Sequence, residues 1–155
     1  MSTRIRTAGV LLAGDQILLE SVQDVEIWTV PGGGLKPQET LEEGCAREYH
    51  EETGLEVTCG RLLCVHEHYW KVGRSVVREY GFYFEVHPLL PFDEPRPAIG
   101  AREAGMQFGW FPLEALRHLP FHPDPLRTVL AEIPSGTVFI STKEEGIRKG
   151  KRTVS

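Results

Sequence analysis

The sequence contains little cysteine, no long apolar run and no excess of positive charge. Its three cysteines are an odd number without the paired spacing of a zinc site, so we expect reduced thiols and a cytoplasmic location. No apolar run reaches the roughly 20 residues of a membrane-spanning helix, so no membrane association is expected. The net charge of −5 gives nucleic acid binding little support.

The organisation along the chain predicts one domain. The 155 residues can bury one core, and 41% hydrophobic with 25% charged residues is an ordinary globular composition. We find no internal repeat and no linker. We therefore expect a single domain over residues 1–142, followed by a polar tail over residues 143–155. A homodimer is left open.

Hydrophobic periodicity and turn residues predict the secondary structure. A hairpin is expected over residues 5–13 and 16–21, and a short strand over 27–30, which the glycine run ends. A helix follows over 40–53, then strands over 55–69 and 75–87, a loop over 88–100, a strand over 106–111, and helices over 113–119 and 125–133. In the strand over 75–87, one parity is expected to face the core (Val76, Tyr80, Phe82, Phe84, Val86), with Glu79, Tyr83 and Glu85 on the other face.

The helix over 40–53 carries an unusual concentration of carboxylates. With the residue before it, it gathers six glutamates around Arg47: Glu39, Glu42, Glu43, Glu48, Glu51 and Glu52. Thr40 with Glu43 forms a capping box, and Gly54 stands where a helix C-terminal glycine belongs. Leu41, Cys45 and Tyr49 define an apolar stripe.

Two of these glutamates lie on the apolar stripe. Glu48 and Glu52 are expected to be partly buried, whereas a merely solvated helix would place them on the opposite face. Two carboxylates about 4 Å apart repel by about 4 kcal/mol at an effective dielectric constant near 20. Because a divalent cation removes this repulsion and oxygen ligands suit Mg²⁺ or Mn²⁺, we predict a metal site whose partner is a pyrophosphate.

The neighbouring residues allow more than one interpretation. Arg47 can form a surface ion pair with Glu43 or Glu51, or it can orient a catalytic carboxylate. The run Gly32-Gly33-Gly34 can be a tight turn, or it can let the backbone approach a metal ion or phosphate.

The segment over residues 33–55, GGLKPQETLEEGCAREYHEETGL, resembles the Nudix box, G-x5-E-x7-R-E-U-x-E-E-x-G-U. Eight positions match: Gly33, Glu39, Arg47, Glu48, Glu51, Glu52, Gly54 and Leu55. Tyr49 departs from the pattern, where an aliphatic residue is usual, and we expect altered packing there with the chemistry retained. The resemblance implies an α/β/α sandwich with a mixed sheet. It also implies Mg²⁺- or Mn²⁺-dependent hydrolysis of a nucleoside diphosphate linked to another moiety X.

The resemblance also implies roles for individual residues. Glu48 and Glu52 are expected to be the main metal ligands, with Glu51 for a further ion and the carbonyl of Gly32 as another ligand. Arg47 and Glu39 are expected to support Glu48. The general base is left open between Glu48, Glu103 and Glu79.

Residues outside the box are candidates for substrate binding. Gly33 allows close approach of a phosphate, and Glu79 lies on the face of its strand that is expected to be away from the core. Aromatic rings that could stack on a base are Trp28, Tyr69, Trp70 and Tyr83. Two alternatives stay open: a non-catalytic nucleotide-binding module on the same fold, and an isomerase acting on a diphosphate ester.

Overall fold

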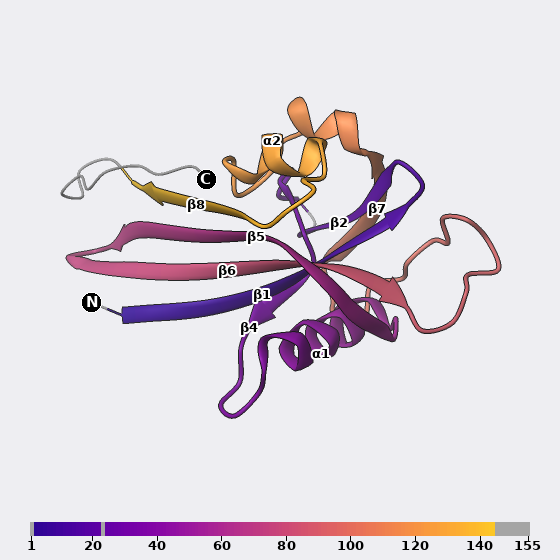
Figure 1. Cartoon of the computed structure of the whole chain (residues 1–155), viewed down its shortest axis with the longest axis horizontal. Helices are drawn as coiled ribbons and strands as arrows, with labels where there is room; N and C mark the ends of the chain where they lie inside the picture. Colours follow the sequence, from indigo (N-terminus) through magenta and orange to yellow (C-terminus); the bar gives the residue numbers. More distant parts are fainter. Residues whose placement is uncertain (1, 23, 145–155) are drawn as a thin grey trace.

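The computed structural model describes residues 2–22 and 24–144, and these residues form a mixed β-sheet between helical layers (Figure 1). The strands are β1 (Ser2–Ala13), β2 (Gln16–Val22), β3 (Trp28–Thr29), β4 (Gly32–Gly34), β5 (Val57–Val72), β6 (Ser75–Pro88), β7 (Met106–Pro112) and β8 (Val138–Lys143). The helices are α1 (Leu41–Thr53), the 3-10 helix η1 (Leu113–Arg117) and α2 (Leu126–Ala131).

The strand order is β3-β2-β1-β6-β5-β8, with β4 paired to β1 and β7 paired to β2. The β1/β6 and β5/β8 pairs are parallel, and the other named pairs are antiparallel. This confirms the predicted mixed sheet. The expected hairpin is formed by β1 and β2, and Gly14 supplies the positive φ of 62° at its turn.

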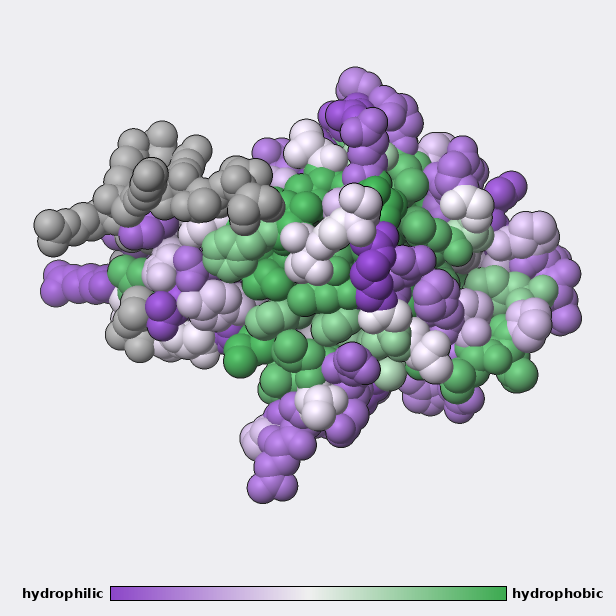
Figure 2. All heavy atoms as spheres, in the orientation of Figure 1, coloured by the Kyte–Doolittle hydropathy of each residue, from purple (hydrophilic) through white to green (hydrophobic). Residues whose placement is uncertain are grey.

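Helices cover the sheet from two sides, as the α/β/α sandwich predicted. In Figure 1, α1 lies below the strands, and α2 lies above them. One buried cluster joins residues of β1 and β2 to η1 and α2, and the other joins the sheet to α1. Figure 2 shows hydrophobic residues gathered across the middle of the molecule in this view, and further ones on the loop after β6, where Leu90 is 76% exposed.

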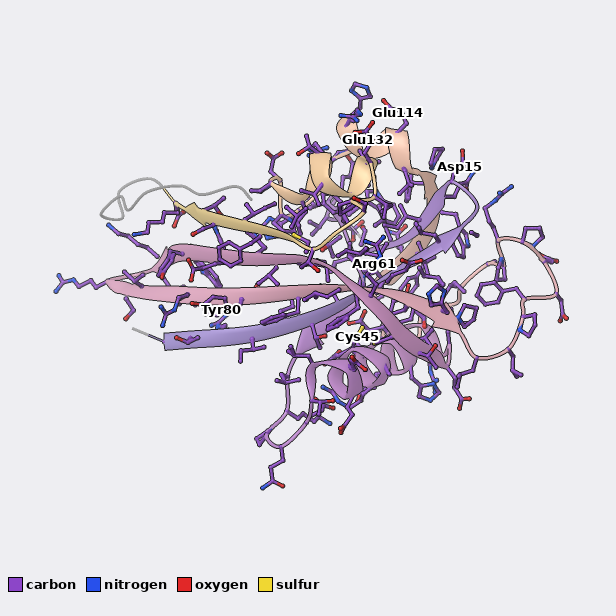
Figure 3. All side chains as sticks on the ribbon, in the orientation of Figure 1. Asp15, Cys45, Arg61, Tyr80, Glu114 and Glu132 are labelled. Atoms are coloured by element: carbon purple, nitrogen blue, oxygen red, sulfur yellow. The ribbon has the colours of Figure 1, made fainter. Side chains whose placement is uncertain are left out.

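Local sequence signals set the boundaries of α1. The Thr40 hydroxyl accepts a hydrogen bond from the Glu43 N–H, and Gly54 ends the helix in the left-handed conformation. Cys45 and Tyr49 are buried as the apolar stripe predicted. Figure 3 shows Cys45 directed from α1 toward the strands.

Three expectations about the elements were wrong. The glycine run does not only break a strand, because Gly32–Gly34 pairs with β1 as β4. The helix expected over 113–119 is the shorter 3-10 helix η1. The strand over 106–111 is not the last one, because β8 follows and lies parallel to β5. The division into a domain over 1–142 and a tail over 143–155 stays a prediction, and residues 145–155 of that tail lie outside the described residues.

The prediction that one parity of β6 faces the core was also wrong. Phe84 and Val86 pack toward α1, but Val77 and Tyr83, on the other parity, are buried as well. The reason is that both faces of β6 are covered, because Tyr83 belongs to the buried cluster with η1 and α2 whereas Phe84 and Val86 belong to the cluster with α1.

Tyr49, the departure from the family pattern, is accommodated by a glycine on β1. A Cβ at Gly9 would lie 2.8 Å from Cδ2 of Tyr49 and 2.9 Å from Cγ1 of Val86, so the ring occupies space that any side chain at position 9 would need. The Tyr49 ring is fully buried, and its hydroxyl has no hydrogen-bond partner among the described residues.

This contact predicts strong coupling between the two positions. Gly9→Ala is expected to destabilise the fold by about 1–3 kcal/mol through overpacking, measured as a lower midpoint in urea unfolding. Tyr49→Leu alone leaves a cavity and is also destabilising, but combining it with Gly9→Ala should recover part of the loss. Additive effects of the two substitutions would contradict the contact.

Candidate active site

Arg47 fixes the carboxylate of Glu48 between α1 and the preceding loop. Its guanidinium donates to both oxygens of Glu39, at 2.5 and 2.9 Å, and to the carbonyl of Gly34 at 3.1 Å. It also donates to Glu48 at 2.9 Å and to Glu51 at 3.2 Å. Arg47 therefore does more than form the surface pair that one interpretation expected, and among the described residues it makes no hydrogen bond or ion pair with Glu43.

The same guanidinium sets the charge of Glu39. Its hydrogen bonds, with a further one from the Lys36 N–H, lower the pKa of Glu39 to about 2. Glu39 therefore remains an anion at neutral pH and holds Arg47 in place. Glu51 is half-exposed, at the outer side of the group, where Lys36 approaches it at 3.9 Å.

The glycine run brings backbone against the Glu48 carboxylate. A Cβ at Gly33 would lie 2.5 Å from Cδ and 2.6 Å from each oxygen of Glu48. At Gly32 a Cβ would lie 2.3 Å from the carbonyl oxygen of Thr7, because β4 is pressed against β1. At Gly34 nothing lies within 4 Å. Close approach thus explains the first two glycines of the run.

A second carboxylate pair lies deeper, between α1 and β2. Glu20 on β2 is only 4% exposed, and its carboxyl group contacts that of Glu52. As carboxylates the two groups only accept hydrogen bonds, and Oε2 of each has no donor among the described residues. Such orphaned buried oxygens call for a proton or a cation between them.

Burial shifts the pKa values of both Glu20 and Glu52. Burial raises the pKa of Glu52, and contact with Glu20 raises it further. Burial also raises the pKa of Glu20, whereas its contact with Glu52 and the charge of Arg6 lower it and repulsion by Glu103 and Glu48 raises it. Arg6 lowers the pKa of Glu52 as well. Glu103 therefore lies close enough to act on this pair, although its own side chain is exposed.

The raised pKa of Glu52 predicts a pH-dependent stability. A glutamate in the unfolded chain loses its proton near pH 4.3, whereas Glu52 in the folded protein keeps its proton to a higher pH. The protonated side chain therefore contributes its full stability below about pH 4.3, and this contribution is lost as the pH rises through the folded pKa. In EDTA, the melting temperature of the wild type should fall more between about pH 7 and about pH 8 than that of Glu52→Gln. This window lies above the titration of ordinary histidines and below that of ordinary thiols.

Thermal unfolding of both proteins in EDTA, and again with excess Mn²⁺, measures this effect. Added metal should raise the melting temperature of the wild type more at the higher pH, because the ion replaces the proton. Equal pH slopes for the wild type and Glu52→Gln would contradict the assignment.

A cavity of about 760 Å³ opens beside this pair. Glu20 and Arg6 are among its lining residues, and the others come from the β2–β3 region, β5, β6, the start of β7, the segment before α2 and the residue after β8. They include three histidines and Trp70; the rings of His66, His68 and Trp70 stack along β5 at centroid distances of 5.4 and 5.6 Å. The His66 and His68 rings share the hydroxyl of Thr142, at 2.8 and 2.7 Å. Burial lowers the pKa of His66 to about 4, so this wall is neutral there at physiological pH.

The residues predicted from the sequence fall into two groups. The hydrogen bonds of Arg47 bring together Glu39, Glu48 and Glu51, and Gly33 lies against Glu48. Glu79 and Tyr83 line the cavity. Tyr83 is only 2% exposed, and the ring of Trp28 packs against that of Phe111 at a centroid distance of 4.7 Å. Base stacking by these two rings stays a prediction.

Two residues of the site were not found from the sequence. Arg6 and Glu20 lie outside the box, in strands whose pattern is otherwise apolar or short. One signal was available: Glu20 interrupts the run Ile17, Leu18, Leu19, where a fully buried strand is expected to stay apolar. Its contact with Glu52 joins two segments that are distant in the sequence, and no local pattern predicts it.

The residues present fit a divalent ion. In the part of the chain that the structure describes, no three carboxylate, imidazole or thiolate groups converge to enclose one. This agrees with Mg²⁺-type sites, which use one or two carboxylates together with waters and substrate phosphates. The orphaned oxygens of Glu20 and Glu52, and the backbone pressed against Glu48, provide hard oxygen donors of that kind.

The sheet between helices, with a carboxylate helix beside a glycine strand, is the arrangement that the resemblance to the Nudix box implied for a hydrolase. Comparison with known proteins specifies it further: the NUDIX domain model matches residues 3–133, so the chain belongs to the Nudix family. It is 34% identical over 118 residues to mouse diphosphoinositol polyphosphate phosphohydrolase 3-alpha, a match covering 72% of this chain and 67% of that protein. Its human counterpart is 33% identical over the same length and coverage.

Solved structures share the fold. The MutT protein from Bacillus halodurans has a TM-score of 0.72 at 16% identity, covering 98% of this chain and 97% of that one. A NUDIX hydrolase from Nitrosomonas europaea has a TM-score of 0.67 at 18% identity, covering 93% and 81%. Nudix hydrolases generally use divalent metal ions and act on small phosphate compounds. Among the described helices, none has the length and apolarity to cross a membrane.

Proposed function

We propose that this enzyme hydrolyses the pyrophosphate bond of a nucleoside diphosphate linked to another moiety X, with Mg²⁺ or Mn²⁺ as cofactor. The observation that carries the proposal is the arrangement of three glutamates: Gly33 of the glycine strand lies against the carboxylate of Glu48, and Glu52 contacts Glu20, which lines the cavity. A pyrophosphate entering the cavity would meet oxygen ligands at one end and a neutral, partly aromatic wall at the other.

The residues have distinct roles in this proposal. Glu48 and Glu52, with the carbonyl of Gly32, hold the ion that neutralises the phosphate charge and activates water; Glu51 serves a further ion. Arg47 positions Glu48, because its guanidinium is itself fixed by Glu39. Gly33 keeps the space in front of Glu48 free.

A carboxylate takes the proton of the attacking water as the bridging P–O bond breaks. Glu103 is the strongest candidate, because it is exposed on the segment before β7 and is near enough to Glu20 to act on its charge. The other two candidates are Glu48, whose carboxylate accepts a hydrogen bond from Arg47, and Glu79, which lies in the wall of the cavity.

The cavity also supports the choice of a nucleotide over a more highly charged substrate. The curated relatives are named for diphosphoinositol polyphosphates, which makes such a compound the second candidate. Recognition of many phosphates calls for several arginines or lysines. The described lining contains a single arginine, Arg6, together with Glu20, Glu79 and Glu144. The aromatic base of a nucleotide, which can stack on Trp70 and the two histidines, fits this wall better than a polyphosphate does.

A substrate screen tests the proposal. Dinucleoside polyphosphates, nucleotide sugars, ADP-ribose, nucleoside triphosphates and a diphosphoinositol polyphosphate are offered with Mg²⁺ and with Mn²⁺, and products are followed by phosphorus NMR. We expect cleavage of a nucleoside diphosphate derivative. Tight binding without product would favour a binding module, and an isomeric diphosphate ester would favour the isomerase. Preference for the inositol compound would overturn the choice of a nucleotide.

The location and assembly of the enzyme belong to the same proposal. All three cysteines are free thiols, which agrees with a reducing cytoplasm. Nucleic acid and membranes are not expected partners, and a homodimer stays a prediction.

A further inference from the structure

Glu20 is the feature of this site that the family pattern does not account for. It lies on β2, outside residues 33–55, and only 4% of it is exposed. Its Oε2 has no hydrogen-bond partner among the described residues, and the residue lines the cavity. An ionisable side chain this deeply buried usually has a partner that neutralises it.

The groups around Glu20 do not supply a cation of its own. Arg6 attracts it, but that guanidinium donates at 2.8 Å to the carbonyl of Val30 and makes no hydrogen bond to Glu20 among the described residues. The other neighbours are carboxyl groups: Glu48 and Glu103 repel Glu20, and Glu52 contacts it directly. Four acidic side chains therefore share one arginine beside the cavity.

A purely structural role does not explain this arrangement. An apolar side chain at position 20 would continue the buried run of β2 and would remove a desolvated charge from the core. Local rules of this kind are broken mainly where function requires it. Contact with Glu52, a proposed metal ligand on a different element, shows where that function lies.

We propose that Glu20 and Glu52 form a two-carboxylate cation site, in which Glu20 is an additional ligand of the divalent ion on the side facing the cavity. The inference rests on the proposed function, since it assigns a further ligand to the same metal site. β2 and α1 each contribute one carboxylate, and waters, backbone carbonyl and substrate phosphate oxygens complete the coordination. An ion held there touches both the helix and the wall against which the substrate lies.

Removing the charge at position 20 should therefore change stability and metal affinity in opposite directions. In Glu20→Gln the amide can donate to Glu52, so repulsion in the metal-free protein disappears. We expect it to unfold at a higher temperature than the wild type in EDTA. The affinity for Mn²⁺, measured by calorimetry on the full chain without substrate, should fall about 10- to 100-fold. Glu20→Asp, which keeps the charge on a shorter side chain, should bind with intermediate affinity.

The controls separate this inference from the proposed function. Glu42→Gln, on an exposed position of α1, should bind Mn²⁺ like the wild type. Unchanged affinity in Glu20→Gln, with lost affinity in Glu52→Gln, would overturn the additional ligand and leave the metal site intact. Lower melting temperature together with lower affinity would mean a structural role and also overturn it. Normal Mn²⁺ binding in both Glu48→Gln and Glu52→Gln would instead refute the proposed function.

Discussion

Glu48→Gln is expected to lower kcat by about 10³-fold while leaving the protein folded. The glutamine keeps the size of the side chain but removes the negative charge that faces Arg47 and that the proposed function assigns to metal binding. Folding should persist, because Arg47 keeps its hydrogen bonds to Glu39, Glu51 and Gly34. Steady-state kinetics with the substrate found in the screen, at saturating Mg²⁺, measures the effect.

The matched control for Glu48→Gln is Glu42→Gln on the same helix. It removes the same charge from α1 at an exposed position, so kcat should stay within about twofold of the wild type if surface charge has its usual small effect. Circular dichroism of both variants verifies folding. Full metal-dependent turnover by Glu48→Gln would contradict its assignment.

Gly33→Ala is expected to reduce kcat/KM by about 10²-fold, because misplacing a catalytic group by about 1 Å has an effect of that size. The new Cβ would lie 2.5–2.6 Å from the Glu48 carboxylate, which must then move away from its position. Arg47 cannot follow freely, since Glu39 and the carbonyl of Gly34 hold it. The substitution therefore separates Glu48 from the group that orients it.

Gly34→Ala provides the control on the next residue of the same strand. Its Cβ would meet nothing within 4 Å, so activity close to that of the wild type is expected. Comparing the two alanine variants, by kinetics and by Mn²⁺ calorimetry, distinguishes a local displacement of Glu48 from a general stiffening of the glycine run. An equal loss of kcat/KM in Gly33→Ala and Gly34→Ala would contradict the steric explanation.

The part of the site on α1 followed from the sequence, because it depends on local spacing. Helical periodicity placed Glu48 and Glu52 on the face with Cys45 and Tyr49, and the structure buries that face. Capping residues set the ends of the helix. The family resemblance then supplied a chemical role that spacing alone left open.

The remaining parts depend on contacts between distant segments. The contact of Glu20 with Glu52 requires β2 to lie under α1, and no local rule gives that packing. The strand β8 pairs with β5 across a long separation in the sequence, which local periodicity does not reveal. The one-sided interpretation of β6 failed for a related reason, since alternation describes a strand with one solvated face and β6 contributes residues to the core clusters on both sides of the sheet.

The hydrogen bonds of Arg47 have a consequence for how fast the enzyme loads its cofactor. The Arg47 guanidinium on α1 donates hydrogen bonds to the carbonyl of Gly34 and to the side chain of Glu39. The segment between β4 and α1 is therefore already ordered in the metal-free protein. The entropy of ordering that segment is lost during folding and not during ion capture. Ion uptake should then be governed by the exchange of water on the ion itself, with no slow closure of the chain around it.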